Sequence, residues 1–322
     1  MRRILANRAV RRVASTIGTL FGVAVFVFVM LRAIPGDQIT AGLGTEAAAL
    51  TPAQRVALEQ YYGLDQSPVT QFFSWLGNML TGNFGYSARS QQGVLEMTLH
   101  SLPVTFELAV FSIVLALLLG VPLGMLSASR TNSPRDAFGQ VVSLAGLSVP
   151  AFLLATTLLS IFAASFGFNP NGQGFATLAE DPLLNLRQMF LPAIVLGFGI
   201  AAPILRTTRT AVLEVRSEDF VRTARAKGVP PRRLQVRHVL GNALVPIVTM
   251  TGLQFGYLLG GAVVVEQIFS VPGVGRQVLL GIQQKEYAVV QSTVLVIALA
   301  FVLVNLLTDG LYRIIDPRVR AS

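Results

Sequence analysis

The sequence predicts an all-α protein that crosses a membrane six times, with both ends of the chain on the cytoplasmic side. The 322 residues are 52% hydrophobic and only 13% charged, and their mean hydropathy is +0.62. Six long stretches are almost free of charge, and the basic residues gather in the segments between them on one side. A soluble globular chain rarely combines these properties, so each apolar stretch is treated as a membrane span.

Six segments reach the length of about 20 residues that crossing the hydrocarbon core requires. They lie at 13–33, 102–127, 138–166, 189–212, 243–265 and 288–312. The first segment could be mistaken for a signal peptide, but it lacks an A-x-A-like cleavage site and is followed by "LRAIPGD". We therefore interpret it as an uncleaved span.

The distribution of Lys and Arg predicts the orientation of these spans. With the N-terminus inside, 19 of the 25 basic residues fall on the cytoplasmic side, as the positive-inside rule requires. The predicted organisation is a cytoplasmic N-terminus with the first span (1–33), an extracytoplasmic helical region (34–101), spans two to four (102–212), a cytoplasmic loop (213–242), spans five and six (243–312) and a cytoplasmic tail (313–322).

The sequence of the extracytoplasmic region predicts two short helices. In "TPAQRVALEQYYGL", Thr51 and Gln54 have the spacing of a capping box, and Gly63 suits the end of the helix. "SPVTQFFSWLGNMLTG" repeats this scheme with Ser67 and Gly82. The pair can form a structural cap on the bundle or a platform for an incoming partner.

Several kinds of chemistry are absent from the sequence. There is no cysteine, and the two histidines, His100 and His238, have no metal-binding spacing, so we expect no metal site. No GxxxxGK[ST] motif is present, so the chain does not bind ATP through a P-loop of its own. We expect no catalytic residues, and if the protein does work, the energy comes from elsewhere.

Polar residues near membrane depth are candidates for function by default. The translocation or gating candidates are Glu107, Ser148, Gln254, Glu266 and, in the outer "VPGVGR" motif, Pro272 and Gly273. The motif can equally be a plain turn. Glycines four residues apart in span five predict close helix packing, either static or between helices that rock; they are Gly252, Gly256 and Gly260. Pro150, Pro192 and Pro203 are expected to break the regular hydrogen-bond ladder of spans three and four, which frees backbone groups that protein or water must satisfy.

The loop at 213–242 concentrates positive charge between spans four and five. "SEDFVRTARAKGV" predicts a short helix with Ser217 as its cap, acidic residues in its first turn, and Arg225 and Lys227 at its end. Gly228 and the prolines at 230–231 end this helix. "RRLQVRHVLGNALVP" then forms a second helix that returns to the membrane. Composition alone would explain the charge as an ordinary inner loop.

The order of residues in this loop resembles a known family. "DFVRTARAKGV…RHVLGNALVP" looks like the cytoplasmic EAA loop of permeases of ATP-binding-cassette importers, with 222–224 in the E-A-A position and Gly228 as the glycine of the motif. The variant is similar to that of the dipeptide, oligopeptide and nickel branch, first permease subunit. "LPVTFELAVFSIVLALLLGVPLGMLSA", "VVVEQIFSVPGVGR" and "LTDGLYRIIDPRVR" extend the likeness. The outer stretch 168–188 departs from it.

This resemblance implies a type I importer bundle in a bacterial inner membrane. Such permeases pair with a homologous second permease, two cytoplasmic ATPases that use ATP-Mg, and an extracytoplasmic solute-binding protein; the chain itself binds no cofactor. The resemblance implies that the loop couples to an ATPase through Asp219, Arg222, Ala224, Arg225, Lys227 and Gly228. It also implies that the substrate is a peptide. The chain is expected to contact membrane lipid and not to bind nucleic acid.

Two other classes of function are compatible with parts of the sequence. A secondary carrier or channel could work alone, although ionisable residues deep in the spans, which a proton relay would need, are not found. A membrane scaffold could also present a basic loop, but it would have no need of glycine seams or helices broken by proline. An intramembrane enzyme has the least support, because no catalytic set is present.

Overall fold

The computed structural model describes residues 2–33, 39, 49–61, 63–87, 89–169, 172 and 174–315. The chain divides into two compact units. Unit 1 contains Met1–Pro103 with Gly273–Val302, and unit 2 contains Val104–Pro272 with Leu303–Ser322. Two long helices, α5 (Val94–Ser129) and α14 (Tyr287–Ile315), contribute residues to both units.

Helices make up nearly all of both units. Unit 1 also contains α1 (Arg2–Ala33), α3 (Pro52–Tyr61), α4 (Pro68–Leu80), the paired strands β1 (Tyr86–Ser87) and β2 (Gln92–Gly93), and α13 (Val274–Gln283). Unit 2 also contains α6 (Pro134–Ser148), α7 (Ala151–Phe166), α8 (Pro182–Ser217), α9 (Asp219–Ala226), α10 (Pro231–Arg233), the π-helix η2 (Leu234–Leu240), α11 (Gly241–Gly261) and α12 (Val263–Ile268).

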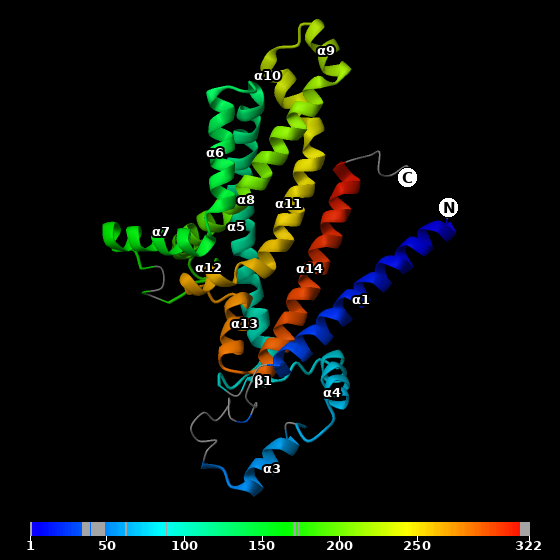
Figure 1. Ribbon diagram of the computed structural model, residues 1–322, viewed down its shortest axis with the longest axis vertical. Helices are drawn as coiled ribbons and strands as arrows, with labels where there is room; N and C mark the ends of the chain where they lie inside the picture. The colour runs from blue at the N-terminus through cyan, green and yellow to red at the C-terminus, as the bar shows by residue number, and fades with distance from the viewer. Residues whose placement is uncertain are drawn as a thin grey trace. The chain divides into compact units, whose positions relative to one another are not determined.

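Five of the six predicted spans coincide with helices that are long and apolar enough to cross a membrane. The third predicted span, 138–166, is broken at Pro150, as the sequence predicts. The chain turns by 97° between α6 and α7 (Figure 1). Val149 and Pro150 both have extended backbone there. The proline ring disfavours helical geometry in the residue before it, so α6 ends at Ser148 although the apolar sequence continues.

The other two prolines that are expected to break a backbone ladder, Pro192 and Pro203, lie inside a continuous helix. Helix α8 runs unbroken from Pro182 to Ser217 and contains both prolines. It packs against α6, α7 and α11, and most of its central residues are buried. Neighbouring helices of this kind can compensate for the backbone bonds that a proline removes, whereas Pro150 stands at an exposed end of α7.

Small residues bring the helices of unit 2 close to α8. On α5, a Cβ atom added to Gly124 would lie 2.6 Å from the Cβ of Thr208 on α8. On α6, a Cβ atom at Gly146 would lie 2.9 Å from the Cβ of Ala202. The buried residues of α6 recur at helical spacing and are all small or polar; they are Asp136, Gly139, Ser143 and Gly146. The α5–α8 and α6–α8 contacts therefore leave no room for larger side chains.

Unit 1 is held together by polar contacts between the β-hairpin and the segment before and within α14. Ser87 donates a hydrogen bond to the carboxylate of Glu286 at 2.9 Å, and the backbone N–H of Arg89 donates to the same carboxylate. Ser292 donates to the backbone carbonyl of Phe84 at 2.6 Å. The hairpin is thereby tied to residues about 200 positions away in the sequence.

The predicted caps of the two short helices are confirmed. Thr51 and Gln54 exchange the two hydrogen bonds of a capping box, and Gly63 has a left-handed φ of +65° just beyond α3. Ser67 accepts a hydrogen bond from the backbone N–H of Thr70 at the start of α4, and Gly82 follows its end with φ +87°. These local signals specify the helix ends without reference to tertiary contacts.

Candidate functional site

Helix α9 follows the end of α8 (Figure 1). It has one buried and one exposed face. Val221 is 1% exposed and lies in an apolar cluster with Val212 of α8, Leu234 and Val239 of η2. Ala224 packs against the same cluster. Among the predicted coupling residues, those that lie on the exposed side are Asp219, Arg222, Arg225, Lys227 and Gly228. The helix is therefore fixed on the bundle and presents its charges outward.

The end of α9 is a glycine turn, as the sequence predicts. Gly228 has φ +77°, and the N–H of Val229 donates to the carbonyl of Ala224 at 3.2 Å. This pattern is a Schellman motif, in which a left-handed residue lets the chain pair the last carbonyls of a helix. A Cβ atom at Gly228 would meet nothing within 4 Å. A side chain there is disfavoured by backbone strain and not by a clash.

The beginning of α9 differs from the prediction. Ser217 does not cap α9; it is the last residue of α8, and its hydroxyl donates to the carbonyl of Glu214 at 2.6 Å. Glu218 occupies the N-cap position with extended backbone, and its side chain makes no capping hydrogen bond. A serine hydroxyl that donates to a carbonyl of its own helix is not available to cap the helix that follows. A single extended residue thus separates α8 from α9.

The charges of the loop are almost all directed to solvent. Arg222 and Asp219 form an ion pair at 3.3 Å with side chains that are 73% and 95% exposed. Over the part of the chain that the structure describes, Arg222 is the only basic residue of 222–237 with an ion pair. Exposed pairs of this kind contribute little to stability, so the charges are available for contact with another surface.

A π-helix connects the loop to α11. Leu234–Leu240 form seven residues of π-helix, and buried Leu234 and Val239 pack into the cluster that also holds Val221 of α9. Asn242 donates a side-chain hydrogen bond to the carbonyl of His238 at 2.6 Å. Helices of π type are rare and concentrate at functional sites. Helix α9 is thus packed against both α8 and the start of α11.

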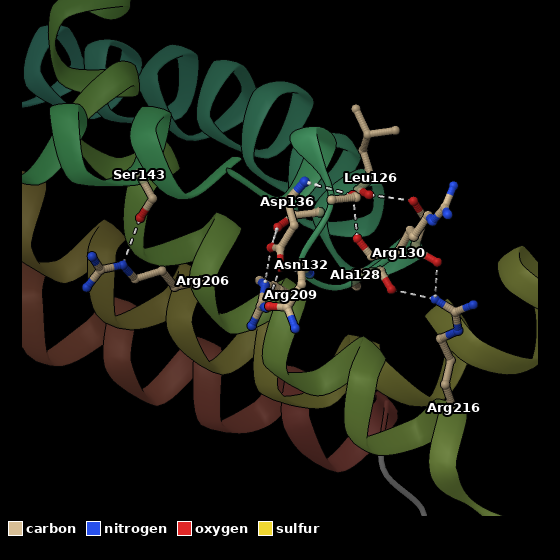
Figure 2. A network of polar contacts seen from close by, with 12 residues as sticks. Leu126, Ala128, Arg130, Asn132, Asp136, Ser143, Arg206, Arg209 and Arg216 are labelled. Carbon is tan, nitrogen blue, oxygen red and sulfur yellow. Dashed lines mark hydrogen bonds and ion pairs between the residues drawn. The ribbon is translucent and has the colours of Figure 1, made fainter. Parts of the chain in front are cut away.

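A buried ion pair lies beside this loop (Figure 2). The carboxylate of Asp136 is 1% exposed and accepts hydrogen bonds from Arg209 Nε at 2.8 Å and Arg209 Nη2 at 2.9 Å. Ser127 at the end of α5 donates to it at 2.6 Å, and the backbone N–H of Asn132 donates at 3.1 Å. One carboxylate therefore joins α5, the turn after it, α6 and α8.

Two further arginines of α8 extend the network. Arg216 donates through Nη1 to the backbone carbonyls of Ala128 and Ser129 at the end of α5. Arg206 donates to the hydroxyl of Ser143 on α6 at 2.8 Å. The last carbonyls of a helix have no partner within that helix and attract cations. Arg216 satisfies two such groups (Figure 2), three residues before α9 begins at Asp219.

Comparison with known proteins identifies the family. Residues 120–321 match the model of the binding-protein-dependent transport system inner membrane component. Residues 5–109 match the model of the N-terminal part of such membrane components. The chain belongs to this family. It is thus a non-catalytic inner-membrane permease subunit of a binding-protein-dependent importer, in which separate subunits hydrolyse ATP, as its resemblance to importer permeases implies.

Several curated relatives cover the whole permease. Glutathione transport system permease proteins GsiC are 39% identical in Pectobacterium atrosepticum, 37% in Escherichia coli K12 and 38% in Salmonella typhimurium. Each match covers 98% of this chain and 99% of the relative. A solved amino acid ABC transporter with histidines is 14% identical, with a TM-score of 0.47 over 70% of this chain and 94% of its own.

The predicted translocation residues of the permease lie in different surroundings. Glu266 is fully buried and accepts a hydrogen bond from Thr105 at 2.7 Å. Glu107 is half-buried and lies close to Asn185 of α8. Ser148 is exposed at the end of α6, and Gln254 is half-buried on α11. These positions do not test a role in translocation, which stays a prediction.

The "VPGVGR" motif begins a helix. Pro272 is half-buried and Gly273 is buried, and Gly273 is the N-cap of α13, which starts at Val274. The turn lies just before the motif, where Ser270 has φ +54° and Val271 donates its N–H to the carbonyl of Glu266. A gating role for Pro272 and Gly273 stays a prediction.

The predicted glycine seam of span five is only partly buried. Gly252 and Gly256 are buried on α11, whereas Gly260 is exposed and a Cβ atom there would meet nothing within 4 Å. The closest approaches that the structure describes are on α5 and α6 instead. "GVPLG" at 120–124 carries the same four-residue spacing, so this signal was available in the sequence.

The ion pair of Asp136 with Arg209 was not among the predicted site residues. The two residues are 73 positions apart, and a single sequence gives no indication of such a pairing. One local signal was present, because Ser133, Pro134 and Asp136 have the pattern of a helix start. Ser133 does cap α6 by accepting from the N–H of Asp136. That cap places the carboxylate at the inner face of the first turn.

Proposed function

We propose that the permease forms the pathway for peptides, either di- or oligopeptides or glutathione-like compounds, that a solute-binding protein delivers. The names of the relatives support this class of substrate, since they are glutathione transport permeases over their full length. We also propose that the chain pairs with a homologous second permease, and that ATP hydrolysis by two ATPase subunits drives the pair.

The docking element for an ATPase in this proposal is α9. The observation that carries it is the division of α9 into a buried apolar face at Val221 and an exposed charged face at Arg222 and Arg225. A helix anchored on one side and open on the other can receive a contact and pass its displacement to the bundle. Lys227, Asp219 and the turn at Gly228 complete the exposed surface.

Co-purification tests the docking. The whole transporter, with a tag on this chain, is extracted after reversing two charges of α9 (Arg222→Glu with Arg225→Glu). We expect the amount of ATPase recovered per permease to fall severalfold, and to fall further as salt is raised. Reversal of two exposed charges on the neighbouring turn (Arg130→Glu with Arg135→Glu) is the matched control. Equal recovery in both double variants would contradict docking through α9.

Transport by the reconstituted complex tests the substrate. Proteoliposomes that contain the permeases, the ATPases and the solute-binding protein are supplied with labelled glutathione, and unlabelled dipeptides or longer peptides compete for uptake. We expect ATP-dependent uptake that at least one of these peptides carries or inhibits. Uptake of none of them, in a complex whose ATPase responds to another solute, would contradict the proposed substrate class.

A further inference from the structure

The contacts of Asp136 form a bridge between three helices at one end of unit 2. Its two carboxylate oxygens accept from Ser127 of α5, from the backbone of Asn132 and twice from Arg209 of α8. Asp136 itself is on α6. A two-pronged arginine contact fixes direction as well as distance, so α6 and α8 cannot slide past one another without breaking it.

Packing around the bridge removes other ways for these helices to move. A Cβ atom at Gly139 of α6 would lie 2.9 Å from the Cβ of Ser127 on α5, and Gly124 of α5 is similarly close to Thr208. The backbones are in near contact at these points. Cores packed in this way switch between discrete arrangements and do not deform continuously.

Arg216 connects the bridge to α9. It holds the last carbonyls of α5 at Ala128 and Ser129 and is two residues from Glu218, the only residue between α8 and α9. Glu218 has extended backbone, and its N–H donates to Val215. A displacement of α9 would therefore move the end of α8 directly. Arg216 would pass this movement to α5, and Arg209 would pass it to α6.

We propose that Asp136, Arg209 and Arg216 form a clamp that makes α5, α6 and α8 follow the displacement of α9 as one body. These are positioning residues, because they act through the helices that they join. The proposal rests on the proposed docking of an ATPase to α9. Without the clamp, the ATPase would still bind and hydrolyse ATP, but less of its movement would reach the pathway.

The coupling ratio, ATP hydrolysed per substrate transported, tests the clamp in proteoliposomes with all subunits. Asp136→Asn keeps the shape of the side chain but removes the charge that Arg209 needs, and Arg216→Gln removes both bonds to α5. We expect at least a fivefold rise in the ratio for each variant, with normal recovery of ATPase. Arg135→Gln, next to Asp136 but exposed, is the control and should keep the ratio of the unmodified protein.

The outcomes separate the clamp from the docking. A ratio within twofold of the unmodified protein in both clamp variants would overturn the proposal, whatever α9 binds. Poor assembly of Asp136→Asn together with normal coupling in Arg216→Gln would also overturn it, because the contacts would then serve folding alone. Failure of docking would appear instead as normal ATPase recovery in the α9 charge-reversal variant.

Discussion

The two ends of unit 2 hold their buried polar groups in different ways. At the α9 end, Asp136 accepts from four donors, two of them on the charged Arg209. At the Asn185 end, where α8 begins, the segment 174–176 is held by neutral amides. Asn185 donates to the carbonyl of Ala176 at 3.1 Å, and Gln188 bonds to both Gly174 and Ala176.

Glu107, a half-buried acid close to Asn185, also differs from Asp136. Glu107 Oε1 and Asn185 Oδ1 are buried and have no hydrogen-bond partner over the part of the chain that the structure describes. A neutral hydrogen bond contributes about 0.5–1.5 kcal/mol, whereas breaking a buried ion pair costs about 3–5 kcal/mol. The α9 end is therefore held by stronger contacts than the Asn185 end.

The largest expected effect follows from removing Arg209. Arg209→Met leaves the carboxylate of Asp136 buried without its cation, and we expect a loss of about 3–5 kcal/mol in the free energy of unfolding. Denaturant titration of the purified complex, followed by helical circular dichroism, measures it. Arg135→Met removes an exposed arginine and should change little. A midpoint equal to that of this control would show that the pair does not stiffen the α9 end.

A second effect tests the close packing next to the pair. Gly124→Val places a side chain where a Cβ atom already lies 2.6 Å from Thr208 Cβ and 2.7 Å from the carbonyl of Leu205. We expect a loss of about 1–3 kcal/mol from overpacking. Gly260→Ala, where a Cβ meets nothing, is the matched glycine and should be neutral or stabilising. Equal tolerance of both changes in thermal unfolding would contradict the tight seam.

A substitution at Gln188 tests the contacts at the Asn185 end. Gln188→Leu removes the bonds to Gly174 and Ala176, which at about 0.5–1.5 kcal/mol each amount to roughly 1–3 kcal/mol. Amide hydrogen exchange of Ala176 should accelerate about tenfold to a hundredfold. Exchange at Asn132, whose N–H is bound by Asp136, should stay the same. Faster exchange at both Ala176 and Asn132 would mean that the Asn185 end and the α9 end of unit 2 are not independent.

The smallest expected effect has the opposite sign. Glu107→Gln supplies an amide donor near Asn185 Oδ1, a buried acceptor that has no partner among the described residues, so we expect a gain of up to about 1 kcal/mol. The same acid-to-amide exchange at Asp136 removes charge from a satisfied site and should destabilise. Parallel thermal unfolding of the two variants makes the comparison. A loss for Glu107→Gln equal to that for Asp136→Asn would show that both acids are equally well paired.

The sequence allowed prediction of those features that depend on neighbouring residues. The apolar segments, the capping box of Thr51 with Gln54 and the left-handed turn at Gly228 are local, and all three are present. The break at Pro150 was predictable from the proline itself, although hydrophobicity continues across it. Ser217 was misassigned because a hydroxyl can serve either of two adjoining helices.

The remaining features depend on which helices become neighbours. Asp136 meets Arg209, and Asn185 meets Ala176, only after the chain has folded, and no spacing rule in one sequence relates them. The glycine seam shows the same limit. Gly124 and Gly260 both belong to four-residue repeats, but only Gly124 faces another helix at close range. Spacing predicts which residues could permit contact, and packing decides which of them do.

The most direct measurement of the central claim is an electron–electron distance within unit 2. Spin labels at exposed Thr131, in the turn after α5, and at exposed Ala226, at the end of α9, report whether these segments move together. The clamp predicts one narrow distance distribution that is the same in the nucleotide-free and ATP-bound transporter, and that broadens in Asp136→Asn. A mean distance that shifts with nucleotide in the unmodified protein by more than the width of the distribution would contradict it.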